Sequence, residues 1–380
     1  MILIEDSPRD FRAWQAKLPS KCVLSTLPKE ETSMRFYTKM HKFYCGIDLH
    51  ARSMYLCILD QEGNTLVHRN MPTNGQRFLK NIAPYREDLV VAVECMFTWY
   101  WLADLCQREG IAFVLGHPLY MKAIHGGKAK NDKIDADKIA RLLRSNMLPQ
   151  AYVYPASMRA TRDLLRRRNH LVNKRAELLA HIQNTNSQYN LPAFGKKIAR
   201  KSNREGLGER FIDPCVQQSI ELDMALIDVY DQRLAELELY IVRTAKGHDA
   251  NTFYRLRSVP GIGKILALVI LYEIQDIARF ERVGNFLSYA RLVKCAKESA
   301  GKRYGSSGAK IGNVHLRWAF GEAACLFLRN NPEGQKLHQR LVNKHGKAKA
   351  LSVLAQKLGR AVYFMLKRQQ AFDMNKFVTR

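Results

Sequence analysis

From Phe43 onward, short runs alternate apolar and polar residues with a period of two, which is typical of strands. This pattern predicts strands over residues 43–48, 53–59 and 65–69, with a hairpin turn at Glu62-Gly63-Asn64 between the last two. The unbroken apolar run at 89–93 predicts a strand buried on both faces. A helix is then predicted near 98–108, a strand at 112–115 and a second helix from about Asn131.

Beyond Pro155 the apolar residues follow a helical period instead. In a first series an apolar residue recurs every seven positions, at Leu164, Leu171 and Leu178, and the arginines and lysines between them give this helix a basic face. A second series has the same spacing, at Ile220, Ile227, Leu234 and Ile241. The two predicted helices form a coiled-coil segment that either pairs as an antiparallel hairpin or mediates dimerisation. The basic stretch between them, residues 195–210, is predicted to be a mobile loop.

A third pattern starts where Pro260-Gly261-Ile262-Gly263-Lys264 leads into a helix-forming run. This arrangement is typical of a helix-hairpin-helix. Its glycines allow the backbone to approach a phosphate, and the amides at the start of the following helix point toward the anion. Gly261, Gly263 and Lys264 are therefore candidate nucleic-acid contacts.

Together these patterns divide the chain into four segments. Residues 1–42 form an N-terminal extension, and residues 43–155 form an α/β domain of the ribonuclease H-like type, because three antiparallel strands precede alternating helices and strands. Residues 156–250 hold the coiled-coil helices and the basic loop. Residues 251–380 form a mainly α C-terminal domain with the helix-hairpin-helix.

The charge of the chain limits its partners. Among 380 residues, 61 lysines and arginines face 35 aspartates and glutamates, so the formal net charge is +26. Such a chain attracts polyanions, and nucleic acid is favoured over the alternatives of a ribosome-associated protein or a solvated basic surface. No apolar run is long enough for a membrane span, residues 1–20 do not resemble a signal peptide, and the eight scattered cysteines are typical of a reduced cytoplasmic protein.

Four carboxylates stand out against this basic background, each at the edge of an apolar run. Asp48 and Glu94 end two predicted strands, while Asp132 and Asp135 are three residues apart and so share one helix face. Converging carboxylates require cations, and their oxygens suit Mg²⁺, with Mn²⁺ as an alternative. Taken singly, Asp48 is also explained by a strand-end turn and Asp132 by a helix N-cap. Asp137 points to a different helix face and is assigned to the surface or the surroundings of the site.

These residues resemble a known family, the DEDD transposases of the one-ten family of insertion sequences. The resemblance covers about residues 43–330 and is carried by these motifs: Tyr44-Cys45-Gly46-Ile47-Asp48, Val93-Glu94, Lys130-Asn131-Asp132, Asp135-Ala136, Pro260-Gly261-Ile262-Gly263, Glu298-Ser299-Ala300-Gly301-Lys302, Lys310-Ile311-Gly312-Asn313 and His315-Leu316-Arg317. It implies a RuvC-like N-terminal domain and recombination of donor and target DNA under the guidance of a structured bridge RNA. It also implies a homodimer or tetramer and a nucleoid-associated location in a prokaryotic cytoplasm.

The resemblance further implies that a serine of the C-terminal domain attacks the scissile phosphodiester and holds the DNA as a phosphoserine linkage. The matching position is Ser299, although Glu298 and Ala300 depart from the usual Ser-Ser-Gly-Gly-Lys, and Ser306 or Ser307 is an alternative nucleophile. Further candidate phosphate contacts are Lys130, Lys302, Arg303, Lys310 and Arg317.

Two other functions fit the same residues. A metal-dependent junction nuclease would keep the acids and hydrolyse with water, without a covalent intermediate. A non-catalytic nucleic-acid-binding protein would use the acids as ordinary helix and turn caps. Replacement of Ser299 by alanine separates the transposase from the nuclease, and replacement of Asp48 or Asp132 by asparagine separates both enzymes from the binding protein.

Overall fold

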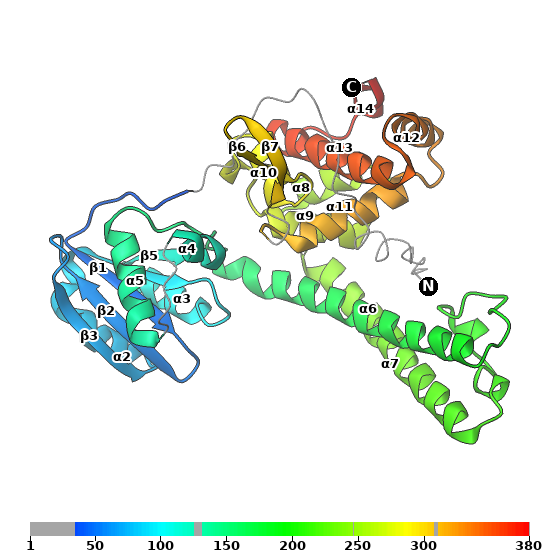
Figure 1. Cartoon of the computed structure of the whole chain (residues 1–380), viewed down its shortest axis with the longest axis horizontal. Coiled ribbons are helices and arrows are strands. Elements are labelled where there is room, and N and C mark those ends of the chain that lie inside the picture. Colours follow the sequence, from blue (N-terminus) through cyan, green and yellow to red (C-terminus); the bar gives the residue numbers. More distant parts are fainter. Residues whose placement is uncertain (1–34, 125–130, 246, 308–310, 380) are drawn as a thin grey trace. The chain divides into compact units, whose positions relative to one another are not determined.

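The computed structural model of the chain describes residues 35–124, 131–245, 247–307 and 311–379. These residues form two compact units, one ending at Ser157 and the other starting at Met158. Figure 1 shows a sheet with helices in the first unit and a largely helical second unit. Within the described ranges, no helix has the length and apolar character required to cross a bilayer.

The first unit is built on a mixed five-stranded sheet with the order β3-β2-β1-β4-β5. All five predicted strands are present; they are β1 (Phe43–Leu49), β2 (Ser53–Leu59), β3 (Thr65–Pro72), β4 (Leu89–Glu94) and β5 (Ala112–Gly116). The first three are antiparallel, whereas β1, β4 and β5 run parallel to one another. This mixed topology is consistent with the predicted ribonuclease H-like α/β domain.

Helices cover both faces of this sheet, which explains the unbroken apolar run of β4. They are α2 (Gly75–Ile82), the 3₁₀ turn η1 (Ala83–Asp88), α3 (Tyr100–Arg108), α4 (Pro118–Ile124) and α5 (Asp132–Arg144). Alternate residues of β1 face opposite cores, as the pleat requires. Cys45 and Ile47 pack in the core that also contains Phe78 and Leu102, whereas Tyr44 packs with Ile139 of α5.

The described end of the predicted N-terminal extension, residues 35–42, is attached to this unit. Phe36 forms an isolated bridge with Pro149, and the amide of Gln150 donates to the carbonyl of Arg35. His41 Nδ1 lies 2.6 Å from a carboxylate oxygen of Asp88. The remainder of the extension, residues 1–34, lies outside the described residues.

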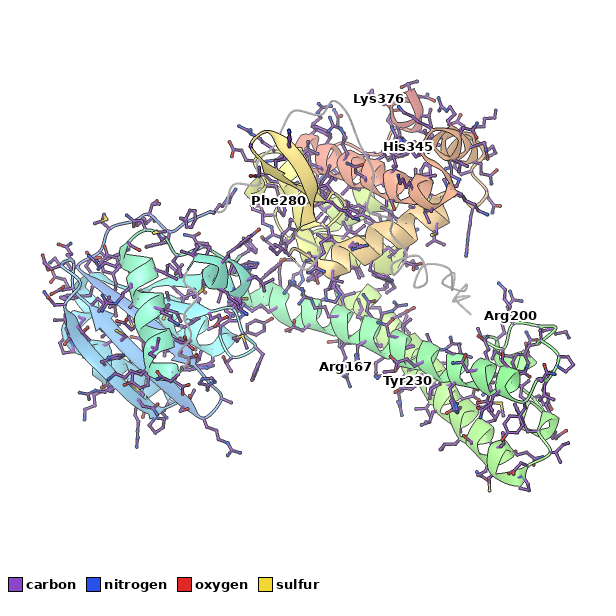
Figure 2. All side chains as sticks on the ribbon, in the orientation of Figure 1. Arg167, Arg200, Tyr230, Phe280, His345 and Lys376 are labelled. Atoms are coloured by element: carbon purple, nitrogen blue, oxygen red, sulfur yellow. The ribbon has the colours of Figure 1, made fainter. Side chains whose placement is uncertain are left out.

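The two long helices predicted beyond Pro155 are α6 (Ala156–Gln188) and α7 (Pro214–Ala245), and they pair antiparallel within the chain. Their register is marked by three ion pairs, Arg168 with Glu238, Arg175 with Asp231, and His181 with Asp223. The second heptad series, including Ile220 and Ile227, is fully buried. Figure 2 labels Arg167 on α6 and Tyr230 on α7 along this pair.

The structure corrects part of the predicted basic face of α6, in which Arg167 and Lys174 are exposed but other basic residues are not. Arg162 and Arg168 are buried, Arg175 is half-buried, and Arg168 and Arg175 form ion pairs with α7. The heptad leucines are only half-buried, whereas the adjacent Leu165 and Leu179 lie in the core. Much of the positive charge of this helix therefore neutralises internal carboxylates instead of facing solvent.

The basic segment at residues 195–210, predicted to be a mobile loop, packs against the helix pair. The segment contains the 3₁₀ turns η2 (Lys201–Asn203) and η3 (Gly208–Arg210), and Ile198 and Leu207 are buried against the ends of α6 and α7. Arg204 is only 4% exposed and donates to Asp228 and Asp231 at 2.6 and 2.8 Å. Burial of apolar side chains and this buried guanidinium hold the loop on the helix pair.

The rest of the second unit is mainly helical, as predicted. Its elements are α8 (Ala250–Arg257), α9 (Lys264–Ile274), the 3₁₀ turn η4 (Ile277–Arg279), α10 (Val283–Tyr289), α11 (Val314–Phe327), α12 (Pro332–His345), α13 (Lys347–Arg368) and α14 (Met374–Thr379). Helix α9 is buried along nearly its whole length. An antiparallel hairpin of β6 (Cys295–Ser299) and β7 (Lys302–Ser307), drawn in yellow in Figure 1, is an addition that the hydrophobic pattern did not predict.

Candidate active site

The carboxyl ends of β1 and β4 place two of the predicted acids side by side. Ile47 pairs in parallel with Val93, and Asp48 and Glu94 are the next residues of the two strands. Both side chains are half-buried. The register of the two central strands therefore brings the first two acids to the same edge of the sheet, as predicted.

Helix α5 supplies the other two acids. The side chain of Asn131 caps the helix by accepting a hydrogen bond from the amide of Ile134 at 2.8 Å, so Asp132 is not the N-cap. Asp132 and Asp135 instead occupy the first turn, where negative charge is favourable. This removes the explanation of Asp132 as a simple capping residue.

A glycine in β1 sets the distance between this helix and the sheet. A Cβ atom on Gly46 would lie 2.3 Å from the amide nitrogen of Ala140 and 2.4 Å from the carbonyl oxygen of Ala136. Only glycine allows α5 to pass this close over the strand. Because Asp48 is two residues from Gly46, it lies on the same face of β1, beneath the start of α5.

The structure brings Asp48 and Asp132 together around a histidine that the sequence reasoning missed. His50 Nε2 lies 3.3 Å from an oxygen of Asp48 and 3.6 Å from an oxygen of Asp132. One ligand atom from each of these three residues lies within 4.8 Å of the other two. Among the residues that the structure describes, this is the group with the geometry to hold a metal ion.

The electrostatics of the group follow first from the burial of Asp48 and then from the charges around it. Burial raises the pKa of Asp48 above its usual value, the nearby charge of His50 opposes this, and the carboxylates of Asp132 and Asp135 raise it further. A divalent cation would offset this repulsion, since it favours the ionised forms of all three acids. Asp135 Oδ1 also lies 3.4 Å from Lys138 Nζ, so a lysine on the next helical turn neutralises part of its charge.

Asp137 lies away from this group, as predicted. Its carboxylate pairs with Arg141 at 2.8 Å and approaches the thiol of Cys57 on β2 at 3.8 Å. It therefore helps to attach α5 to the sheet.

In the second unit, Ser299 is the last residue of β6 and pairs with Lys302 across the hairpin turn. Both residues are exposed. Ala300 and Gly301 form the turn with φ of 49° and 74°, the left-handed values that a two-residue hairpin turn requires. Ser306 and Ser307 end β7, so the alternative serines lie at the opposite end of the hairpin from Ser299.

The remaining candidate contacts are distributed over the second unit. Gly261 has a φ of 84° and packs on α11, where a Cβ atom would lie 2.4 Å from the amide nitrogen of Phe327. Gly263 caps α9 and faces open space, and Lys264 beside it is exposed. Arg317 is half-buried on α11, and Arg303 lies on β7 opposite Glu298. Lys130 and Lys310 lie outside the described residues.

A buried ion network lies at the start of α11. Asn313 caps α11 and donates to the carboxylate of Glu273 at 2.7 Å. Glu273 also pairs with Arg162 at 3.0 Å and Arg166 at 2.6 Å. Burial alone would raise the pKa of Glu273, but the two arginines and Asn313 lower it to about 2. This network ties α6, α9 and α11 together.

Two protein-family models match this chain, one over the region of the acids and one over the region of Ser299. A DEDD transposase family model of IS110 elements matches residues 45–190, the range that contains all four acids. A model described as the transposase IS116/IS110/IS902 family matches residues 254–339, which include Ser299 and Asn313. The chain is therefore a DNA transposase.

Similarity to individual proteins extends over most of the chain. It is 24% identical to the transposase for insertion sequence element IS1111A of Coxiella burnetii, over 86% of this chain and 90% of that protein. It is 26% identical to a putative transposase, y4qE, of Sinorhizobium fredii, over 77% of this chain and 72% of that protein. The chain belongs to the IS110 family of DEDD transposases.

Proposed function

We propose that this transposase cuts and rejoins DNA strands with a site made of Asp48, Glu94, Asp132, Asp135 and Ser299. The observation that carries the proposal is the approach of Asp48 and Asp132 at the edge of the central strands, with ligand atoms within 4.8 Å of each other and of His50. The family adds DNA as the substrate class. Glu94 ends the strand beside Asp48, and Asp135 contributes to the negative potential at Asp48.

The donor set fits a hard divalent cation, with Mg²⁺ as the proposed ion and Mn²⁺ as the alternative. The residues that would hold it are the four acids. When bound, such an ion stabilises the negative charge that develops on phosphate oxygens during displacement. Asp48 is half-buried, whereas Asp132 and His50 are exposed, so the group is open to a DNA strand.

Ser299 is proposed as the nucleophile. Its Oγ would form a bond to the scissile phosphorus while one P–O bond to the neighbouring deoxyribose breaks. The serine proton passes to a carboxylate, and the departing oxygen gains a proton. Because the phosphodiester is exchanged for a phosphoserine, its bond energy is retained and a second strand can be joined without an external energy source. The exposed position of Ser299 at the tip of the hairpin allows a DNA strand to reach it.

Sequence choice is proposed to come from a bridge RNA that pairs with donor and target DNA. The net charge of +26 supports polyanion binding without base readout by the protein. The α8–α9 segment is proposed to act as a helix-hairpin-helix, in which Gly263 and Lys264 are exposed. The other proposed phosphate contacts are Gly261, Lys130, Lys302, Arg303, Lys310 and Arg317. The site of action would be the nucleoid in a prokaryotic cytoplasm.

We propose further that the active form is a dimer or tetramer. The proposed domain organisation of each subunit has four segments, at residues 1–42, 43–155, 156–250 and 251–380. Strand exchange requires several scissile bonds to be held at once. Leu222, Leu226 and Val229 of α7 are 59%, 42% and 56% exposed at helical spacing. Such an apolar strip on the proposed coiled coil supports association of subunits.

A strand-transfer assay with matched serine variants tests this function. Ser299→Ala is expected to abolish both cleavage and joining, whereas a Ser306→Ala, Ser307→Ala double variant retains them. Asp48→Asn is expected to abolish both as well. Retained cleavage without joining in Ser299→Ala would support the water-dependent junction nuclease instead. Full strand transfer by Asp48→Asn would refute the metal site.

A further inference from the structure

We infer that His50 is a ligand of the metal ion held by Asp48 and Asp132, so that the site binds through mixed nitrogen and oxygen donors. This inference rests on the proposed function and assigns a residue outside the four acids. It concerns the first unit alone, in which β1, α5 and the turn after β1 lie.

The distances are compatible with shared coordination as well as with the ion pair that His50 forms with Asp48. Charge-assisted hydrogen bonds between nitrogen and carboxylate oxygen are typically about 2.7 to 2.9 Å long. His50 Nε2 is instead 3.3 Å from Asp48 and 3.6 Å from Asp132. Adjacent ligands of an octahedral ion with bonds of about 2.1 Å are separated by about 3 Å. The two distances from His50 are close to that spacing, and all three donor atoms lie within 4.8 Å of one another.

The backbone around His50 is held in place from two sides. Its amide donates to the carbonyl of Ser53 at 3.0 Å, and its carbonyl accepts from the hydroxyl of Thr73 at 2.9 Å. The amide of Thr73 donates in turn to the backbone carbonyl of Arg52. These bonds close the turn between β1 and β2 against the end of β3. The imidazole is thus presented from a fixed backbone, as a metal ligand requires.

The chemical consequence is a change in ion preference. Carboxylates suit Mg²⁺ and Mn²⁺, whereas an imidazole nitrogen raises affinity for later transition metals and is a poor ligand for Mg²⁺. With His50 coordinated, the chain should bind Mn²⁺ more tightly than Mg²⁺, so this inference favours the alternative ion of the proposed function. If His50 were only a positively charged neighbour of the acids, it would repel the ion, and its removal would strengthen binding.

Electron paramagnetic resonance of Mn²⁺ on the full-length protein tests this directly. The wild-type signal is expected to carry nitrogen coupling from one imidazole, and His50→Ala should lose the coupling and bind Mn²⁺ at least about tenfold more weakly. His50→Gln is the matched variant, because it keeps a neutral polar side chain of similar reach without the imidazole nitrogen. It should behave as His50→Ala does.

A third variant separates this inference from the proposed function. Asp48→Asn should lose Mn²⁺ binding whether or not His50 is a ligand. The acid site stands if Asp48→Asn loses the ion. In that case the role of His50 is refuted by a wild-type signal without nitrogen coupling, or by His50→Ala that binds Mn²⁺ at least as tightly as the wild type. If Asp48→Asn binds Mn²⁺ as the wild type does, the proposed acid site itself fails.

Discussion

The acid site and the serine hairpin are supported by their units in opposite ways. The acids lie directly on a core, because Asp48 ends a central strand and α5 packs against Gly46 at backbone contact distance. Ser299 instead lies at the exposed tip of a two-stranded hairpin. Six residues after the end of β7, Asn313 donates a hydrogen bond to the buried Glu273. Metal ligation requires fixed distances, whereas a nucleophile that engages a large substrate requires access, and each region fits the role proposed for it.

The largest effect on stability is expected at Glu273, in the buried ion network at the start of α11. Glu273→Gln leaves the buried Arg162 and the half-buried Arg166 without their carboxylate, and we expect a loss of about 3 kcal/mol in the stability of the second unit. Chemical denaturation measures this. Glu236→Gln is the control, since Glu236 forms an exposed pair with Arg233 and its replacement should change stability far less. Equal effects of the two variants would contradict the stabilising role of this network.

The same network predicts a pH dependence. The pKa of Glu273 is lowered from 4.5 to about 2, so its ionised form stabilises the folded state. This contribution is complete above about pH 4.5 and is lost as the pH falls from there toward about 2. The difference in stability between wild type and Glu273→Gln should therefore shrink as the medium is acidified through this window. A difference that stays constant would mean that the charge of Glu273 contributes nothing.

The next largest effect on stability is expected at Gly46, where α5 passes close over β1. Gly46→Ala forces the backbone of α5 away from β1, with an expected loss of about 3 kcal/mol and weaker metal binding, because Asp132 moves relative to Asp48. Thermal unfolding and Mn²⁺ titration measure the two effects. Gly195→Ala is the control, since its Cβ atom would meet nothing within 4 Å. Unchanged metal binding in a destabilised Gly46→Ala would show that this packing does not position the acids.

The smallest effects on stability are expected at the tip of the β6–β7 hairpin, where substitutions at two neighbouring residues should act in opposite directions. Ala300 has a φ of 49°, a conformation that costs an L-residue about 1 kcal/mol, so Ala300→Gly should stabilise the hairpin by about that amount. Gly301→Ala should destabilise it by a similar amount through the backbone alone, since its Cβ atom would meet nothing within 4 Å. Hydrogen exchange of the β6 and β7 amides measures both. A shift of the same sign in the two variants would contradict the turn geometry.

The sequence predicted the first unit better than the second, for physical reasons. Strands such as 89–93 are buried on both faces and therefore carry a strong apolar pattern, and their order predicted the meeting of Asp48 with Glu94. The β6–β7 hairpin carries charged residues such as Lys297, Glu298 and Lys302 and has alanine at its turn, so it lacks both alternation and a typical turn sequence.

The interactions that the sequence could not reveal are those between distant segments. Arg168 and Arg175 resemble a solvated basic face until the register of α7 places Glu238 and Asp231 opposite them. His50 is 82 positions before Asp132, and only the packing of α5 on Gly46 brings the two side chains together. The one local indication was its place two residues after Asp48, at the end of the same strand.

The central claim is that acids of the first unit activate a serine of the second. Peptide mapping by mass spectrometry of the protein trapped on DNA tests it most directly. The expected result is a nucleotide phosphate on the peptide containing Ser299, present in the wild type and absent in Asp48→Asn. A modified Ser306 or Ser307, an adduct that persists in Asp48→Asn, or cleavage without any adduct would contradict it.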